Sequence, residues 1–330
     1  MPPSPRWWSP PGPRSPRTPR RPAPRPPEHD PSSKEDPVSP HHSHVGRPRP
    51  EARAELARRE GDGVLPLLTE RSTRVAGARK LTRRSGRDDA GAFLAEGRQA
   101  VSEALAQAES EPGAVLELFV TEAAADTHRD LLAAARVPVH VATDRAVASL
   151  SETVTPQGLV AVCALRDVPA GTLVTDPPRL AVALAELNDP GNAGTVLRTA
   201  DACGARTVVF GAGSADPYGG KVVRSSAGSL FHVDVVRSTP LAELVPQVQA
   251  AGTTVLAADG GGEVALDTAG DEGLLSGPVL WLFGNEARGL DPALADLADA
   301  RVRIPMRGRA ESLNLSVAAS ICLYATQLAE

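Results

Sequence analysis

The sequence predicts an α/β protein, with a mostly parallel sheet flanked by helices in the C-terminal part. A small α/β domain and a disordered N-terminal tail are expected before it. Apolar strand-like runs alternate with helical segments twice along the chain, which is typical of layered α/β domains. Leu180–Leu187 is an almost unbroken apolar run, as expected of a parallel strand buried on both faces. Residues 1–50 hold 17 of the 31 prolines. This segment has too little apolar surface to bury and is expected to remain unfolded.

Charge is distributed unevenly along the chain, which carries a formal net charge of −5. Residues 1–62 and residues 63–90 each carry about +4, and the remainder carries about −13. A basic N-terminal region on an acidic protein indicates a polyanionic partner, although a solvated basic tail explains residues 1–62 equally well.

Composition also indicates the cellular compartment in which the protein is expected to act. No apolar run approaches the ~20 residues of a membrane span, and the N-terminus lacks the apolar core of a secretory signal. Cys163, Cys203 and Cys322 are far apart and odd in number, so we expect a reducing cytoplasm, no disulfides and no metal cluster. His41-His42-Ser43-His44 has no ligand partner at suitable spacing and is not expected to hold a metal. Glu51–Glu60 is at most a short charged helix.

The small domain is predicted to begin near Leu65 and to occupy residues 63–164. Six basic residues are concentrated before its apolar pattern starts: Arg74, Arg79, Lys80, Arg83, Arg84 and Arg87. We expect strands at 92–97, 115–120, 137–141 and 158–163, with helices at 101–108, 128–135 and 146–150. Residues 165–178, rich in Pro and Gly, are predicted to be a linker.

The C-terminal domain, residues 179–330, repeats the alternation more strongly. After 180–187, strands are expected at 207–210, 233–236, 254–258, 278–283 and 302–304. Helices are expected at 194–203, 219–230, 241–251, 292–298 and 314–328. In such sheets ligands bind at the carboxyl ends of the strands.

Three unusual loops each follow a predicted strand in this domain. They are Asn188–Arg198, Phe283–Leu290 and Ile304–Ala318. Common cofactor signatures are absent: Gly191 and Gly194 do not make a dinucleotide fingerprint, and no P-loop lysine, nucleophile elbow or zinc spacing occurs. These absences argue against a nicotinamide-dependent oxidoreductase.

Together and in order, the three loops resemble the signature of the SpoU family of RNA 2′-O-ribose methyltransferases, within the SPOUT superfamily. The matching motifs are Asn192-x-Gly194-x-x-x-Arg198, Phe283-Gly284-Asn285-Glu286-x-x-Gly289-Leu290 and Ile304-Pro305-Met306-x-Gly308-x-x-x-Ser312-Leu313-Asn314-x-Ser316. The segments Asp216–Tyr218 and Arg224–Phe231 are similar too. Phe93-Leu94-x-Glu96-Gly97 and Thr155-Pro156-Gln157-Gly158 resemble the family's substrate-binding domain. The resemblance covers residues 72–330.

This resemblance implies a SPOUT-type sheet with a deep trefoil knot that binds S-adenosyl-L-methionine, in a homodimer whose sites are completed by motif-one residues of the partner subunit. The implied cofactor-binding residues are Phe283, Gly284, Ile304, Met306 and Leu313. The implied catalytic residues are Arg198, Asn192, Glu286, Ser312 and Asn314.

Arg198 corresponds to the arginine that activates the ribose 2′-OH in the family. Because a guanidinium scarcely loses its proton, a second interpretation is that Arg198 binds the adjacent phosphate and stabilises developing alkoxide. Asn192, Ser312 and Asn314 also have a purely structural interpretation as helix caps, and Glu286 as a loop charge.

The expected function is therefore methylation of a ribose in structured RNA, with 23S ribosomal RNA favoured by the attached small domain. Transfer RNA and a non-catalytic role in ribosome assembly are the alternatives, and methylation that confers antibiotic resistance is a variant of the first. The basic residues 74–87 and Arg224 are predicted to contact RNA, and Tyr218 to contact RNA or a second subunit. A start-site artefact is an alternative explanation of the tail.

Overall fold

The computed structural model of the chain describes residues 67–329. The predicted disordered tail, the histidine-rich segment 41–44, the charged segment 51–60 and the predicted domain start at Leu65 lie outside the described residues.

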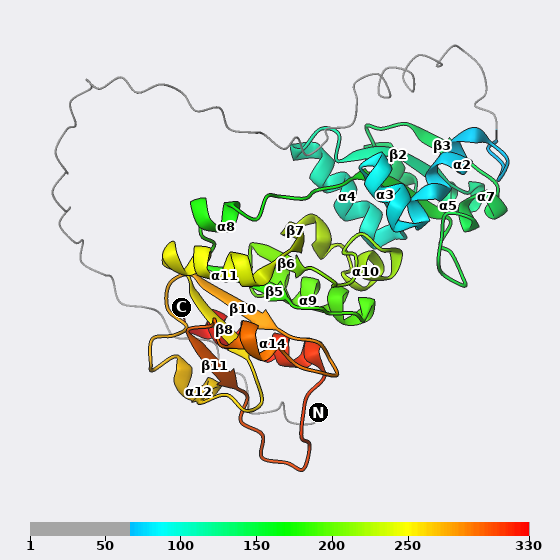
Figure 1. The fold of residues 1–330 in the computed structure, drawn as a ribbon. Coiled ribbons are helices and arrows are strands. Elements are labelled where there is room, and N and C mark those ends of the chain that lie inside the picture. Colours follow the sequence, from blue (N-terminus) through cyan, green and yellow to red (C-terminus); the bar gives the residue numbers. More distant parts are fainter. Residues whose placement is uncertain (1–66, 330) are drawn as a thin grey trace, which may run out of the picture. The chain divides into compact units, whose positions relative to one another are not determined.

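A four-stranded mixed sheet forms the centre of the first domain (Figure 1). Its strands are β1 (Ala92–Glu96), β2 (Val115–Val120), β3 (Val139–Val141) and β4 (Leu159–Ala164), in the order β1-β4-β2-β3. β4 is antiparallel to β1 and β2, whereas β2 and β3 are parallel. All four strands were predicted, to within about two residues.

The basic stretch before β1 is helical, which the sequence pattern did not predict. It forms α2 (Thr73–Arg79), the 3-10 helix η1 (Lys80–Thr82) and α3 (Arg84–Ala90). Within this stretch Val75, Ala78 and Leu81 are buried. Their three-residue spacing is an apolar stripe, which the intervening arginines obscure.

The other helices of this domain pack around the sheet. They are α4 (Arg98–Ser110), α5 (Glu122–Thr127), α6 (Arg129–Ala134) and α7 (Asp144–Ala148). The single helix predicted at 128–135 begins earlier and is divided in two. Its start at α5 is explained by Thr121, whose side chain accepts a hydrogen bond from the backbone N–H of Ala124 at 3.2 Å.

The segment predicted as a linker, residues 165–178, contains a short helix, α8 (Thr172–Thr175). Asp167 forms an isolated parallel bridge with Val235. This segment is therefore partly ordered by contacts with the C-terminal domain. Such contacts cannot be predicted from the local composition.

Seven parallel strands form the sheet of the C-terminal domain. They are β5 (Leu180–Leu184), β6 (Thr207–Gly211), β7 (Asp234–Thr239), β8 (Thr254–Ala258), β9 (Val264–Ala265), β10 (Val279–Phe283) and β11 (Ala300–Arg303). Their order is β7-β6-β5-β10-β8-β11-β9. The buried runs of β5, β6 and β10 explain their unbroken apolar sequences.

The helices of this domain are α9 (Pro190–Ala202), α10 (Gly220–Ser225), α11 (Leu241–Ala250), α12 (Leu266–Ala269), α13 (Pro292–Ala295) and α14 (Leu315–Leu328), with the 3-10 helix η2 (Ser229–Phe231). The sequence did not predict β9 or α12. The helix predicted at 219–230 is shorter in the structure, where α10 ends at Ser225. Ala227 and Gly228 adopt positive φ angles of 50° and 99°, which do not continue a helix.

Two features of this domain position the motif loops. β5 and β10 are adjacent, with Leu184 opposite Phe283, so their following loops emerge at the same edge. α14 packs against α9, where the hydroxyls of Thr199 and Ser320 lie 3.0 Å apart. The indole N–H of Trp281 donates to Thr326 at 2.9 Å, which anchors α14 to β10.

Buried contacts also join the two domains. Phe93 of β1 packs against Tyr218, with ring centroids 4.8 Å apart, and against Phe231 at 5.9 Å. Arg87 forms an ion pair with Asp216 at 2.7 Å, in which both side chains are less than a tenth exposed. The first domain is therefore anchored to the segment 216–231 of the second.

No helix within residues 67–329 is long and apolar enough to cross a membrane. Within the same residues, no group of three or more His, Cys, Asp or Glu side chains is arranged to hold a metal ion.

Candidate active site

A chain of hydrogen bonds joins the three motif loops. The Asn192 side-chain amide donates to Glu286 Oε1 at 3.2 Å, and the Asn314 amide donates to Asn192 Oδ1 at 3.1 Å. These partners are 94 and 122 residues apart in the sequence. Three residues predicted separately from three motifs therefore meet at one point.

Asn314 also caps helix α14. Its Oδ1 accepts from the backbone N–H of Ser316 at 2.9 Å, from that of Val317 at 3.4 Å and from the Ser316 hydroxyl at 2.6 Å. Its amide N–H remains directed to Asn192, so capping and the inter-motif contact use different atoms of one side chain.

The cap of helix α9 is Asp189 rather than Asn192. Asp189 Oδ1 accepts from the backbone N–H of Asn192 at 2.8 Å. This hydrogen bond, with a smaller contribution from Lys221, holds the pKa of Asp189 below its usual value. The structural interpretation of Asn192 as the cap is therefore wrong, because the helix begins earlier than predicted, at Pro190.

Arg198 lies on α9 six residues after Asn192, and its side chain is exposed. Among residues 67–329 it has no hydrogen-bond or ion-pair partner. A guanidinium without an internal partner is available to an anionic group of a ligand.

Four residues predicted from the third motif line one cavity of about 160 Å³, namely Ile304, Met306, Ser312 and Leu313. Other lining residues were not predicted from the sequence, among them Asp259 and Gly260, which follow β8. Their position directly after a predicted parallel strand was the available signal. The cavity thus combines an apolar wall with hydroxyl and carboxylate oxygens.

Phe283 and Gly284 do not line this cavity. Phe283 is 2% exposed and packs against Trp281. A Cβ atom at position 284 would lie 2.2 Å from the backbone of Gly289 and Leu290, so only glycine permits this close return of the motif-two loop.

The two signatures of the first domain also meet. The Gln157 side chain accepts from the backbone N–H of Arg98 at 3.0 Å, next to Gly97. A Cβ atom on Gly97 would lie 3.1 Å from Gln157 Oε1.

The predicted RNA-contacting residues fall into two groups. Arg79, Lys80 and Arg83 are exposed and line a cavity of the first domain. The others already have protein partners: Arg74 pairs with Glu117 at 2.6 Å, Arg84 bonds Ser238, Arg87 is buried on Asp216, and Arg224 pairs with Glu96 at 3.3 Å.

Tyr218 is 1% exposed, so the prediction that it contacts RNA or a second subunit is wrong. Its hydroxyl accepts from the backbone N–H of Arg166 at 3.0 Å, and Arg237 lies 5.1 Å from its ring centroid. Burial raises its pKa further above the usual value for tyrosine. The prediction assumed that the tyrosine hydroxyl needed an external partner, but its partner is a backbone group that is distant in the sequence.

Family models match both parts of the chain. The SpoU rRNA Methylase family matches residues 179–324, and the MRM3-like substrate binding domain matches residues 72–161. The RlmP 23S rRNA (guanosine(2553)-2′-O)-methyltransferase of Bacillus subtilis is 34% identical over 258 residues, covering 78% of this chain and 97% of the relative.

Solved structures agree. An AdoMet-bound rRNA methyltransferase from Sinorhizobium meliloti has a TM-score of 0.67 and 31% identity, covering 78% of this chain and 95% of that one. The SpoU methyltransferase AviRb from Streptomyces viridochromogenes, in complex with AdoMet, has a TM-score of 0.67 and 30% identity, covering 78% and 98%.

The fold and the joined motifs define an RNA 2′-O-methyltransferase that uses S-adenosylmethionine. The chain belongs to the SpoU rRNA methylase family. The cavity residues fit the cofactor chemically, since Ile304 and Leu313 offer apolar contact to an adenine ring and Asp259 offers acceptors for hydroxyl groups.

Proposed function

We propose that this enzyme methylates the 2′-hydroxyl of a ribose in 23S ribosomal RNA. Two relatives support the choice of RNA: the Bacillus subtilis enzyme described above, and a 23S rRNA (uridine(2479)-2′-O)-methyltransferase of Streptomyces viridochromogenes, 39% identical over 173 residues. The observation that carries the proposal is the Glu286–Asn192–Asn314 hydrogen-bond chain, since it brings polar residues of all three motifs together.

Bound S-adenosylmethionine supplies an electrophilic methyl group, so the protein has mainly to orient the acceptor and assist its deprotonation. Arg198 acts on the RNA, where its guanidinium binds the phosphate next to the target and stabilises negative charge developing on the 2′-oxygen. Glu286 accepts from Asn192 and so orients it, and Asn314 holds the other side of the same amide. Ser312, exposed at the rim of the cavity, contacts the ribose.

The cofactor would be held by the cavity-lining residues Ile304, Met306 and Leu313. Phe283 and Gly284 contribute by shaping the end of β10 and the turn that follows it.

RNA is contacted by the basic surface of the first domain. Arg79, Lys80 and Arg83 offer exposed cations, whereas Arg74, Arg84, Arg87 and Arg224 would have to exchange protein partners for phosphate. The domain organisation that we infer is a tail at 1–62, an RNA-binding domain at 63–164, a connecting segment at 165–178 and a catalytic domain at 179–330.

The active form is a homodimer. Val317, Ile321, Tyr324 and Leu328 are 46%, 37%, 56% and 68% exposed and recur along one stripe of α14. Such a stripe is typical of a helix that packs on another subunit. Asn192 bonds to Asn314 of its own chain, so Arg198 is the motif-one residue that we assign to the partner's site.

We further infer the family's trefoil knot, supported by the path of the chain from β10 past β8 to β11 and back to α9 through α14. The enzyme acts in the cytoplasm, in keeping with three buried, unpaired cysteines among the described residues.

The deciding experiment maps 2′-O-methylated nucleotides in total RNA from cells with and without the gene, and repeats the reaction with purified enzyme and labelled cofactor. We expect one ribose of 23S rRNA to lose its methyl group without the gene and to regain it in vitro. Loss from transfer RNA instead, or no change in either RNA, would refute the proposal.

A further inference from the structure

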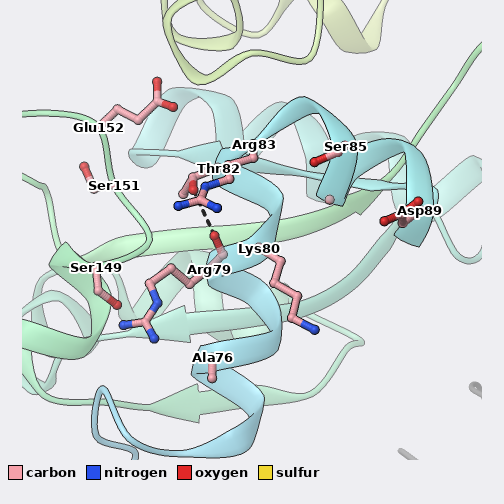
Figure 2. Close-up of a pocket in the computed structure, with 11 residues that line it drawn as sticks. Ala76, Arg79, Lys80, Thr82, Arg83, Ser85, Asp89, Ser149, Ser151 and Glu152 are labelled. Atoms are coloured by element: carbon pink, nitrogen blue, oxygen red, sulfur yellow. Dashed lines mark hydrogen bonds between the residues drawn. The ribbon is translucent and has the colours of Figure 1, made fainter.

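The first domain contains a cavity of about 860 Å³ that none of the methyltransferase motifs lines. It lies over η1 and is bordered by the segment 149–152, which leads from α7 to β4 (Figure 2). A volume of this size is in the range of small-molecule sites, and it exceeds what a single phosphate needs.

One part of the cavity is cationic. Arg79, Lys80 and Arg83 line it with exposed side chains, and none of the three has an ion-pair partner within residues 67–329. Figure 2 shows Arg79 and Lys80 directed to opposite sides of η1, with Arg83 near its end.

Another part of the cavity offers acceptors. The hydroxyl of Ser149 donates to the Ala146 carbonyl at 2.7 Å, which leaves its lone pairs free to accept. The hydroxyl of Ser151 donates to Glu96 at 2.5 Å and already accepts from the backbone N–H of Thr153 at 2.9 Å. Glu152 is exposed beside them and makes no ion pair with any described residue. Figure 2 shows Glu152, Ser151 and Ser149 on the same side of η1 as Arg79.

These two parts together select the ligand. A carboxylate at the wall repels a simple anion, but it accepts hydrogen bonds from the amino group of a nucleobase. An unpaired nucleotide offers both a phosphate for the cations and base donors for the acceptors, and unpaired nucleotides are the usual targets of sequence-specific RNA recognition.

We propose that this cavity binds one unpaired nucleotide of the RNA substrate, with its phosphate on Arg79 and Arg83 and its base amino group on Glu152. The inference rests on the proposed function, and it adds a recognition site separate from the methyl acceptor. A base that carries an amino group, such as cytosine, is preferred over uracil, which has none.

Gly86 lines the cavity, whereas Gly220 lies next to its lining residue Glu152. A Cβ atom on Gly86 would lie 2.1 Å from the Lys80 carbonyl oxygen, so α3 packs tightly on η1. A Cβ atom on Gly220 would lie 2.7 Å from Glu152 Oε2 and 3.2 Å from the Arg224 guanidinium. Because Gly220 begins α10, Glu152 lies against the helix that packs on α9.

The test measures binding of the full chain to short fluorescent oligoribonucleotides of cytidine and of uridine, by fluorescence anisotropy over a range of salt. We expect the wild type to bind oligocytidine several-fold more tightly. Arg79→Gln with Arg83→Gln should weaken the binding of both oligonucleotides by about tenfold and reduce the slope of log affinity against log salt by about 0.7, the value for one phosphate. Arg129→Gln with Arg136→Gln is the matched control, since both arginines are exposed on the same domain outside the cavity, and it should change neither value.

Glu152→Gln separates base recognition from phosphate binding. It should abolish the preference for oligocytidine while retaining affinity for oligouridine. Equal binding of the two oligonucleotides by the wild type, an unchanged preference in Glu152→Gln, or wild-type affinity in the double arginine variant would each overturn the inference. Methylation of 23S rRNA by the wild type, measured in parallel, reports on the proposed function independently of these outcomes.

Discussion

Arg198 illustrates what a single residue contributes to this site. It is exposed on α9 and has no described protein partner, whereas Asn192 on the same helix bonds to Glu286 and Asn314. The two residues therefore differ in surroundings, and we propose that Asn192 organises the motif loops whereas Arg198 acts on the substrate.

Arg198→Ala should lower kcat by about a hundredfold to a thousandfold, as expected for loss of one group that stabilises developing charge. Cofactor affinity should remain near that of the wild type, because Arg198 does not line the cofactor cavity. Single-turnover methylation of 23S rRNA measures the first quantity, and calorimetric titration with S-adenosylmethionine measures the second. Arg206→Ala is the control, since Arg206 pairs with Asp176 and Asp234 at the opposite end of the sheet. Near-normal turnover in Arg198→Ala would contradict the assigned role.

Residue type predicted the chemistry of the arginines, but not their surroundings. Arg83 and Arg87 belong to the same basic run, yet Arg83 is exposed and Arg87 is 5% exposed. The difference depends on Asp216, which is 129 positions away in the sequence. No local sequence pattern predicts an ion-pair partner at that distance along the chain.

Helices α9 and α10 approach each other unusually closely at one glycine. A Cβ atom on Gly194 would lie 1.9 Å from Ser225 Oγ and 2.6 Å from the Val222 carbonyl oxygen. Gly194 is therefore required by packing, and the motif that contains it also sets the position of Asn192 and Arg198.

Gly194→Ala should destabilise the protein by about 1–3 kcal/mol through overpacking, although alanine is the better helix former. The shift of the urea denaturation midpoint measures this loss. Gly171→Ala is the comparison, because a Cβ atom there meets nothing within 4 Å. Equal midpoints for Gly194→Ala and the wild type would show that the two helices do not pack as described.

Elements with a strong apolar period were predicted well, and those without one were missed. Strands at 115–120 and 254–258 match β2 and β8 in the structure. Helices α2 and α3 were not predicted, since α2 buries only Val75 and Ala78 among its apolar residues and the one buried residue of α3 is Arg87. β9 has only two residues and pairs with β11, so tertiary contact alone makes it a strand.

On the scale of the whole molecule, the exposed apolar stripe of α14 should be covered in solution. Val317 and Ile321 are one helical turn apart and lie two and six residues after the first residue of α14, at the end that follows the third motif. A second copy of the chain that packs there would bring its residues close to the cofactor cavity.

If the proposed dimer forms through this stripe, Val317→Glu with Ile321→Glu should give a monomer and abolish methylation, because charges in an apolar interface are costly to desolvate. Light scattering coupled to gel filtration gives the mass, and circular dichroism verifies the fold. Gln327→Glu, exposed on the same helix, should remain dimeric. A wild-type mass of one chain would refute the proposed dimer.

The sequence by itself determined the α/β class, the approximate positions of the strands and the identity of the motif residues, since these depend on local apolar periodicity and on residue chemistry. Only the tertiary structure decided which residues share a partner. It joined Glu286, Asn192 and Asn314, buried Tyr218 and Arg87, and left Arg79, Arg83 and Glu152 around one cavity. The reason is physical: a strand or helix is stabilised largely by neighbours in the chain and by its apolar face, whereas burial and polar pairing depend on segments that meet only when the sheets assemble.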